Sequence, residues 1–209
     1  MQKIFLLNCI ELDLDKNKTS KKCIIFIYMV YQPVNYNDLQ GALSLWYQKA
    51  NAGSAGATEL EEANTYNGSG NGSDYQGNPN DWDVTVVTNM ENLFKDISNI
   101  GSYNVHPEIG NWNVSSVTNM GYMFAGAAAF NQDIGQWNVS QVTIMYGMFQ
   151  DAAAFNQDIG QWSVGNVTRM DSMFNGASSF NQPIGNWNVG NVTDIYAMFR
   201  EASAFNQPI

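Results

Sequence analysis

The ten residues at 130–139 read FNQDIGQWNV, and they return at 155–164 as FNQDIGQWSV and at 180–189 as FNQPIGNWNV. A further copy, FNQPI, begins at Phe205. A fixed period between about 20 and 50 residues is typical of proteins built from stacked structural units. A unit of this length cannot bury its own apolar face, but it can do so against an identical neighbour. The repeat therefore predicts a solenoid.

The tryptophans mark where each unit starts. Trp112 and Trp137 are 25 residues apart, and the same step continues to the next two tryptophans. Trp82 precedes Trp112 by 30 residues, so we expect five extra residues in the first unit, within 98–107. The predicted array covers 82–209, with coils that start at Trp82, Trp112, Trp137, Trp162 and Trp187.

One unit, residues 137–161, indicates what each coil contains. Trp137 and Val139 flank a polar residue, and this alternation favours a short strand with both apolar side chains facing inward. The apolar residues that follow advance by three, three, one and three positions, which favours one face of a short helix; they are Val142, Met145, Met148, Phe149 and Ala152. We therefore expect an α/β fold, a right-handed solenoid of short parallel strands and short helices.

Two sets of repeated residues have separate structural explanations. Asn131 and Gln132, with their equivalents in later coils, are predicted to form side-chain amide ladders that satisfy backbone groups in the turns. The repeated aromatic residues are predicted to fill the core in columns, and they are Trp112, Trp137, Trp162 and Trp187, Phe124, Phe149, Phe174 and Phe199, and Phe130, Phe155 and Phe180.

The stretch FNQDIGQWNVSQVTIMYGMFQDA at 130–152 resembles the unit of BspA-like leucine-rich-repeat surface proteins, a group with a roughly 26-residue repeat that includes bacterial surface proteins and mycoplasma lipoproteins. The resemblance covers 82–209, and LQGALSLWYQKANAG at 39–53 is similar to the amphipathic helix that often precedes such arrays. It implies a leucine-rich-repeat-like fold, a cell-surface or extracellular location and adhesion-like binding without catalytic residues. Trp137 stands where such a motif has leucine, and Val142 stands where it has the usual asparagine.

The chain before the array divides into three parts. Residues 1–34 are expected to be a leader or an irregular segment, with a short buried strand or a secretion signal as alternatives. Residues 35–63 contain the predicted N-terminal capping helix, which Asn37 or Asp38 can cap. Residues 64–81 are rich in Gly, Asn and Ser, which indicates a linker.

Composition argues against several functions. The net charge is −10, and few Lys or Arg residues follow Trp82, so nucleic-acid binding is not expected. The chain has one histidine, His106, and two cysteines before the array, which favour neither a zinc site nor a catalytic triad. Asp133 and Asp158 occupy equivalent positions and could hold calcium, but prolines replace them in later coils, so we favour solvated turn residues. We expect no enzyme activity, no cofactor and no bound metal.

The outward residues are the candidate binding surface. We predict a non-catalytic interaction module that binds a protein partner, with a glycan-binding module and a structural spacer as alternatives. Membrane contact is expected only through an anchor outside this sequence. The candidate residues are Tyr122, Tyr146, Arg169, Asp171, Asp194 and Tyr196 on the predicted helical face, and Asn113, Asn138 and Asn188 on the predicted sheet face.

The last coil is expected to be open. Ile209 falls where Gly and Trp would continue the unit, so the array is predicted to be truncated, as a fragment of a longer one. We expect Trp187, Val189, Met198 and Phe199 to be partly exposed there, together with an unpaired edge. Such edges pair with other chains, which predicts self-association through this end.

Overall fold

The computed structural model describes residues 3–12, 22–30, 33, 37, 39–43, 82–96 and 108–209. Near the N-terminus, β1 (Lys3–Leu12) pairs antiparallel with β2 (Lys22–Val30), with a register shift between Leu6 and Cys9. These two stretches are strands and not irregular chain, and the expectation of a leader remains a prediction. The predicted linker at 64–81 and His106 lie outside the described residues.

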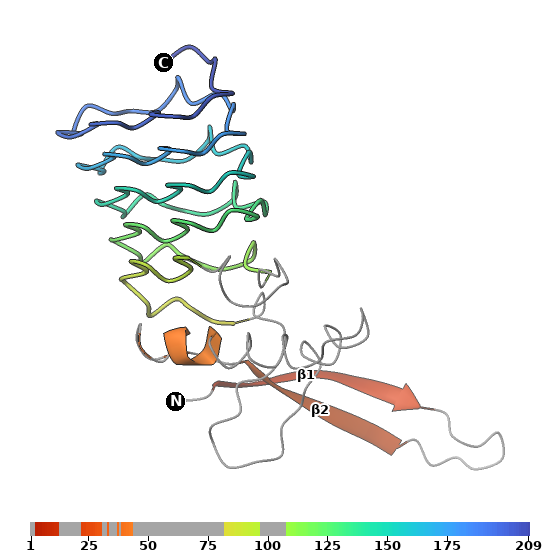
Figure 1. The fold of residues 1–209 in the computed structure, drawn as a ribbon. Coiled ribbons are helices and arrows are strands. Elements are labelled where there is room, and N and C mark those ends of the chain that lie inside the picture. The colour runs from red at the N-terminus through yellow and green to blue at the C-terminus, as the bar shows by residue number, and fades with distance from the viewer. Residues whose placement is uncertain are drawn as a thin grey trace.

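Residues 82–96 and 108–209 form a stack of coils, each lying on the one before it (Figure 1). Isolated parallel bridges join equivalent positions, from Asn119 to Ile144 and from Ile144 to Arg169. The stack has the predicted step of 25 residues. Between Asp96 and Ile109, the register between coils changes by five residues. The N–H of Asp96 donates to the carbonyl of Ala125 with the longer spacing of the first unit, whereas the carbonyl of Ile109 accepts from Trp137 with the spacing of the later coils. This agrees with the predicted position of the extra segment.

The short strand predicted at 137–139 is wrong, because the described repeat region contains only single bridges. The backbone here turns instead. The N–H of Trp137 donates to the carbonyl of Ile134 at 3.1 Å, and the N–H of Val142 donates to the carbonyl of Val139 at 2.9 Å. These bonds span three residues, so both ends of the expected strand belong to tight turns.

The short helix predicted over 142–152 is also wrong. Gly147 has φ +58° and Asp151 has φ +56°, and the equivalent residues of other coils share this conformation. A right-handed helix needs negative φ at every residue, so it cannot pass through these two positions. The apolar steps of three arise from turns, in which the N–H of Met148 donates to the carbonyl of Met145 at 3.2 Å.

Positive φ aligns alternate peptide groups with the direction of stacking. In the coil that starts at Trp112, the carbonyl of Gly121 accepts from the coil before, and the adjoining N–H of Tyr122 donates to the coil after. Four peptides of each inner coil do this. In this coil the donated bonds run from Met120, Tyr122, Phe124 and Gly126 to the carbonyls of Ile144, Tyr146, Met148 and Gln150, at 2.8–2.9 Å. We call this set of bonds the peptide ladder.

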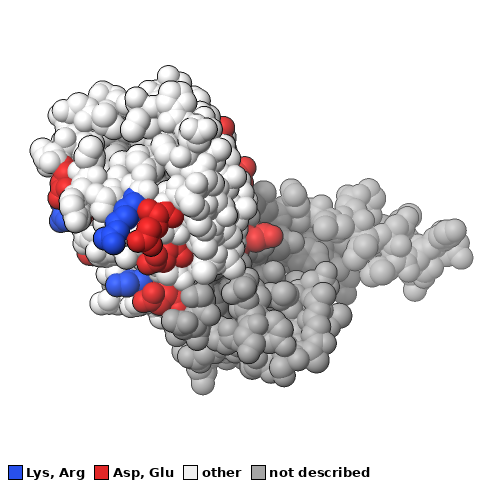
Figure 2. Space-filling view, turned by 45° about the horizontal axis from the view of Figure 1, so that its top comes forward, with Lys and Arg blue, Asp and Glu red and all other residues white. Residues whose placement is uncertain are grey.

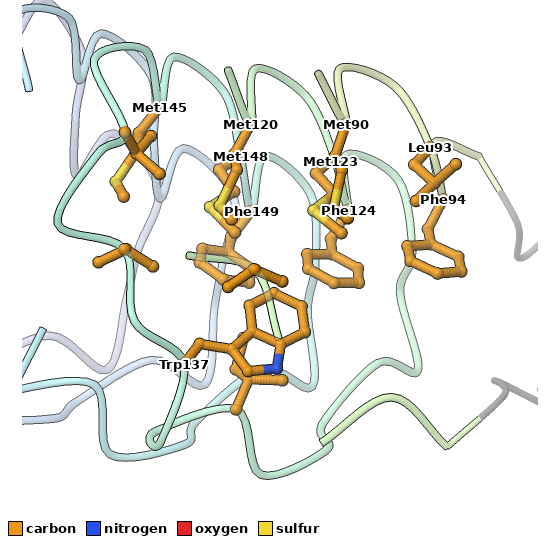
Figure 3. Close-up of a cluster of buried hydrophobic side chains, with 14 of the residues drawn as sticks. Met90, Leu93, Phe94, Met120, Met123, Phe124, Trp137, Met145, Met148 and Phe149 are labelled. Carbon is orange, nitrogen blue, oxygen red and sulfur yellow. The ribbon is translucent and has the colours of Figure 1, made fainter. Parts of the chain in front are cut away.

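The core consists of side-chain columns that run the length of the stack. Phe149 stacks on Phe124 at 5.6 Å between ring centroids and on Phe174 at 5.7 Å, and within its own coil it lies 3.9 Å from Phe155. Figure 3 shows the phenylalanines in line, with pairs of methionines beside them. Trp137 is 4% exposed and Phe149 is 0% exposed, which confirms their predicted inward position.

Polar side chains of the core and of the turns form hydrogen bonds between successive coils. The indole N–H of Trp137 donates to the carbonyl of Ile109 at 3.2 Å, and later tryptophans repeat this bond. The Asn131 side chain accepts from the backbone N–H of Asn156 at 2.9 Å and from the Gln157 amide at 3.0 Å. The next two coils repeat both bonds, which confirms the predicted amide ladder.

The two ends of the stack differ. Residues 39–43 are helical, and Leu39, Ala42 and Leu43 are buried in the same core cluster as the first coil. Figure 1 shows this helix against the first coil, while the rest of the predicted cap, 44–63, lies outside the described residues. At the other end Val189 is 50% exposed, as predicted, whereas Trp187 stays buried at 8%, so that part of the prediction is wrong.

We predict that Trp137→Ala lowers the free energy of unfolding by about 3–5 kcal/mol, because it leaves a cavity between coils and removes the indole bond to Ile109. Chemical denaturation with Gln136→Ala, an exposed neighbour, as control measures the difference. A loss below about 1 kcal/mol would contradict the role of the tryptophan column in the core.

Candidate interaction surface

The repeat varies strongly at three positions on one part of the coil. These positions follow the invariant threonine column and carry four or five residue types across the five coils, while most core residues around them stay the same. The bridge position holds Asn89, Asn119, Ile144, Arg169 and Asp194, the second position holds Glu91, Gly121, Tyr146, Asp171 and Tyr196, and the third holds Asn92, Tyr122, Gly147, Ser172 and Ala197.

Two tyrosines from successive coils meet at these positions. The rings of Tyr122 and Tyr146 lie edge to face, with 4.9 Å between centroids and 81° between planes. Glycines make room for them, because a Cβ at Gly121 would lie 2.7 Å from the Tyr146 ring and one at Gly147 would overlap the Tyr122 ring. The order Gly-Tyr in one coil and Tyr-Gly in the next therefore produces the pair.

A cation covers each tyrosine. The Lys95 ammonium lies 4.9 Å from the centroid of the Tyr122 ring, and the Arg169 guanidinium lies 4.5 Å from the centroid of the Tyr146 ring. Cations in this position are attracted by the negative face of the ring. Arg169 is also held by Asp171, to which its Nε and one terminal nitrogen each donate at 3.0 Å. The guanidinium is therefore held by both the Tyr146 ring and the Asp171 carboxylate.

A carboxylate of the first coil completes the cluster. Glu91 accepts one hydrogen bond from the Tyr146 hydroxyl and a second, at 3.0 Å, from the Asn119 amide. The hydroxyl bond to Glu91 raises the pKa of Tyr146 to about 12, with burial and the negative charge of Glu91 adding to the effect. The hydrogen bond with Asp171, above all, raises the pKa of Arg169. We call these six residues, Glu91, Lys95, Tyr122, Tyr146, Arg169 and Asp171, the tyrosine cluster.

The structure brings together four of the residues predicted from the sequence, namely Tyr122, Tyr146, Arg169 and Asp171. Lys95 and Glu91 were not predicted, although both precede the extra residues of the first unit and align directly with the later coils. When the coils are aligned from their tryptophans, Glu91 occupies the same position as Tyr146. This alignment is the sequence signal that identifies Glu91. Basic and acidic side chains lie side by side on the face drawn in Figure 2, against a mostly uncharged surface.

The other predicted residues lie beside the cluster or apart from it. Asp194 is close enough to Arg169 for its charge to raise the pKa of the guanidinium further, and Tyr196 is 76% exposed. Asn113, Asn138 and Asn188 are exposed and form a column of their own, in which each side chain accepts from the backbone N–H two residues on. Among the residues that the structure describes, no hydrogen bond or ion pair joins that column to the tyrosine cluster.

The described residues contain no group of three His, Cys, Asp or Glu side chains that could hold a metal ion. Asp133 and Asp158 each accept the backbone N–H two residues on, from Gly135 and Gly160 at 2.9 Å, as turn residues do. Of the helical residues that the structure describes, none belongs to a helix long and apolar enough to cross a bilayer.

We predict that Glu91→Gln moves the pKa of Tyr146 from about 12 toward 10, because the charged acceptor is lost. The bond stabilises the protonated phenol, so its contribution to stability is complete below pH 10 and is lost as the pH rises through 12. NMR of 13C-labelled tyrosine Cζ measures the titration, with Tyr196→Phe as control. An unchanged Tyr146 pKa in Glu91→Gln would show that this carboxylate is not the acceptor.

The repeats match a protein family. The family model described as "Mycoplasma protein of unknown function, DUF285" matches residues 63–164 and 134–209, which together span more than half of the 209 residues. No curated protein and no solved structure matches the chain. The chain, with its 25-residue repeats and the residues before them from 63 on, belongs to the DUF285 family.

Proposed function

We propose that this protein is a non-catalytic interaction module, a surface-displayed or secreted repeat protein of the BspA-like type that binds a protein partner through the tyrosine cluster. The proposed architecture is a right-handed, leucine-rich-repeat-like solenoid. The observation that carries the proposal is the cluster itself. Its aromatic and charged side chains are held in place by one another, on a stack whose core positions repeat.

Preorganisation is the reason to expect binding here. Tyr122 and Tyr146 are half-buried, and their partners already restrict their rotamers, so little side-chain entropy remains to be lost in a complex. Tyrosine and arginine are also the residue types that most often dominate the energy of protein interfaces. Gly121 and Gly147 leave the space that the tyrosine pair occupies. Solubility alone would not require this arrangement.

The charges of the cluster are matched internally. Arg169 is paired with Asp171, and Glu91 accepts from Tyr146, so neither an anion nor a cation is favoured strongly by the cluster as a whole. This favours a partner surface that offers apolar contact and hydrogen bonds. Nucleic acid is not expected, because it requires an excess of Lys and Arg that the chain, at net charge −10, does not have.

A glycan-binding module is the second candidate function. Tyr196 is 76% exposed, and Asp194, whose carboxylate accepts the Tyr196 backbone N–H at 3.0 Å, lies two residues before it. An open aromatic ring near a carboxylate offers stacking and hydroxyl recognition to a sugar. The same residues would serve a protein partner, so only experiment separates the two.

We predict that wild-type protein binds at least one member of a panel of purified extracellular proteins, and that Tyr146→Ala and Arg169→Ala each weaken this binding at least about tenfold. Surface plasmon resonance measures the affinities, and a glycan array is tested with the same variants. Gln136→Ala and Gln161→Ala, at exposed positions away from the cluster, are the matched controls.

Three results would contradict the proposal. Binding to glycans alone, lost in Tyr196→Ala, would support the second candidate. Equal binding by the cluster variants and the controls would place the interface elsewhere. Absence of binding in both arrays would favour a structural spacer.

A further inference from the structure

The contact between Tyr122 and Tyr146 places two oxidisable rings side by side. The rings belong to successive coils and lie edge to face, with 4.9 Å between their centroids. Both side chains are half-buried, so part of each ring remains open to solvent. Two phenols at this separation can be joined by oxidation, through the ring carbons beside the hydroxyls.

The coils hold the two rings at this distance. The Tyr122 ring occupies the space beside Gly147, and the Tyr146 ring occupies the space beside Gly121. Their backbones are tied as well, because the N–H of Tyr122 donates to the carbonyl of Tyr146 at 2.9 Å. Reacting groups fixed in good orientation behave as if each were present at an effective concentration of roughly 10⁵ M or more. A reaction within this pair is therefore favoured over one between separate molecules.

One of the two phenols already has an acceptor for its proton. The Tyr146 hydroxyl donates to Glu91, and this bond raises the pKa of Tyr146 to about 12. The phenol is therefore protonated at neutral pH. The Arg169 guanidinium, 4.5 Å from the ring centroid, opposes positive charge on the ring, so loss of an electron alone is disfavoured. Transfer of the proton to Glu91 in the same step leaves a neutral radical and removes this obstacle.

We propose that Tyr122 and Tyr146 are an oxidative cross-linking site, at which a one-electron oxidant of the haem-peroxidase class, using hydrogen peroxide, joins the two rings into dityrosine. The site goes beyond the proposed interaction function and does not rest on it, because the reaction needs no binding partner.

The reaction balances with hydrogen peroxide as the electron acceptor. Each tyrosine loses one electron and one proton, and the proton passes to Glu91 from Tyr146 and to water from Tyr122. The two neutral radicals then form a carbon–carbon bond between one Cε of each ring. The hydrogens on these two carbons move to the phenolic oxygens as the rings become aromatic again, and Glu91 returns its proton to water. The two electrons and two protons removed reduce one hydrogen peroxide to two water molecules.

A ring rotation precedes the bond. The ring planes lie at 81°, whereas coupling requires an ortho carbon of each ring to face the other ring. The torsion that rotates a tyrosine ring has a broad energy profile, so rings that are only half-buried can make this movement. The product links the coils that start at Trp112 and Trp137. It closes a loop in the unfolded chain, as a disulfide does, and should stabilise these two coils in the same way.

Oxidation of the full chain by a haem peroxidase and hydrogen peroxide, in dilute solution, tests the site. Cleavage at Asp133 separates the two tyrosines, so two peptides joined at Tyr122 and Tyr146, together two hydrogens lighter than the free peptides, identify the cross-link by mass spectrometry. It should be the main dityrosine of the folded protein. Oxidation of the same chain in denaturant should yield at least about tenfold less of it, because the fixed orientation is lost.

Three variants distinguish this geometry from general oxidation. Tyr122→Phe keeps a ring but removes the phenol, so the cross-link should disappear, whereas the control Tyr196→Phe should leave its yield unchanged. Glu91→Gln should slow its formation at least about tenfold, because the proton acceptor is weaker. The proposal is overturned by dityrosine that forms mainly between copies, by equal yields in folded and denatured chain, or by wild-type rates in Glu91→Gln.

Discussion

The peptide ladder between coils is the constraint on which the rest of the structure depends. Every inner coil turns four peptide groups along the stack, so each accepts from the coil before and donates to the coil after. The bonds form only if successive coils have the same path, and the same path needs the same residues. Deleting or adding a residue between two ladder positions would move the later donors of that coil off their acceptors in the next coil. The five extra residues of the first unit are tolerated because they fall between Asp96 and Ile109, outside the ladder.

The ladder also explains the backbone strain in the coils. Tyr122, Asp151, Ser172 and Ala197 have φ between 53° and 57°, a conformation that costs an L-residue roughly 1–2 kcal/mol. Positive φ turns the adjoining peptide along the stack, where it gains bonds on both sides. The strain is therefore offset by contacts with neighbours, and a single isolated coil would have the cost without the bonds. This is the physical reason that one unit does not fold alone.

The sequence predicts the columns of the core and the period, because burial requires the same apolar residues in every coil. Trp137, Phe149 and the Asn131 amide ladder are confirmed for that reason. It does not predict the local conformation, since apolar steps of three fit a chain of tight turns as well as a helix. No residue type signals that Tyr122 or Ala197 adopts positive φ. Four of the six residues of the tyrosine cluster follow from variable outward positions, while Glu91 and Lys95 require the same alignment to be extended to the first coil.

Repetition and variation have separate places in this molecule, and that separation bears on function. The ladder and the core columns leave little freedom, so differences between coils gather where side chains leave the stack. The alternation of Gly121–Tyr122 with Tyr146–Gly147 shows that even these differences obey the spacing of the coils, because a tyrosine ring covers the neighbouring position one coil away. Two bulky residues at the same position in adjacent coils would compete for one space. A binding surface on this stack therefore consists of residues from several coils. A substitution in one coil changes the space available to the side chain of the neighbouring coil.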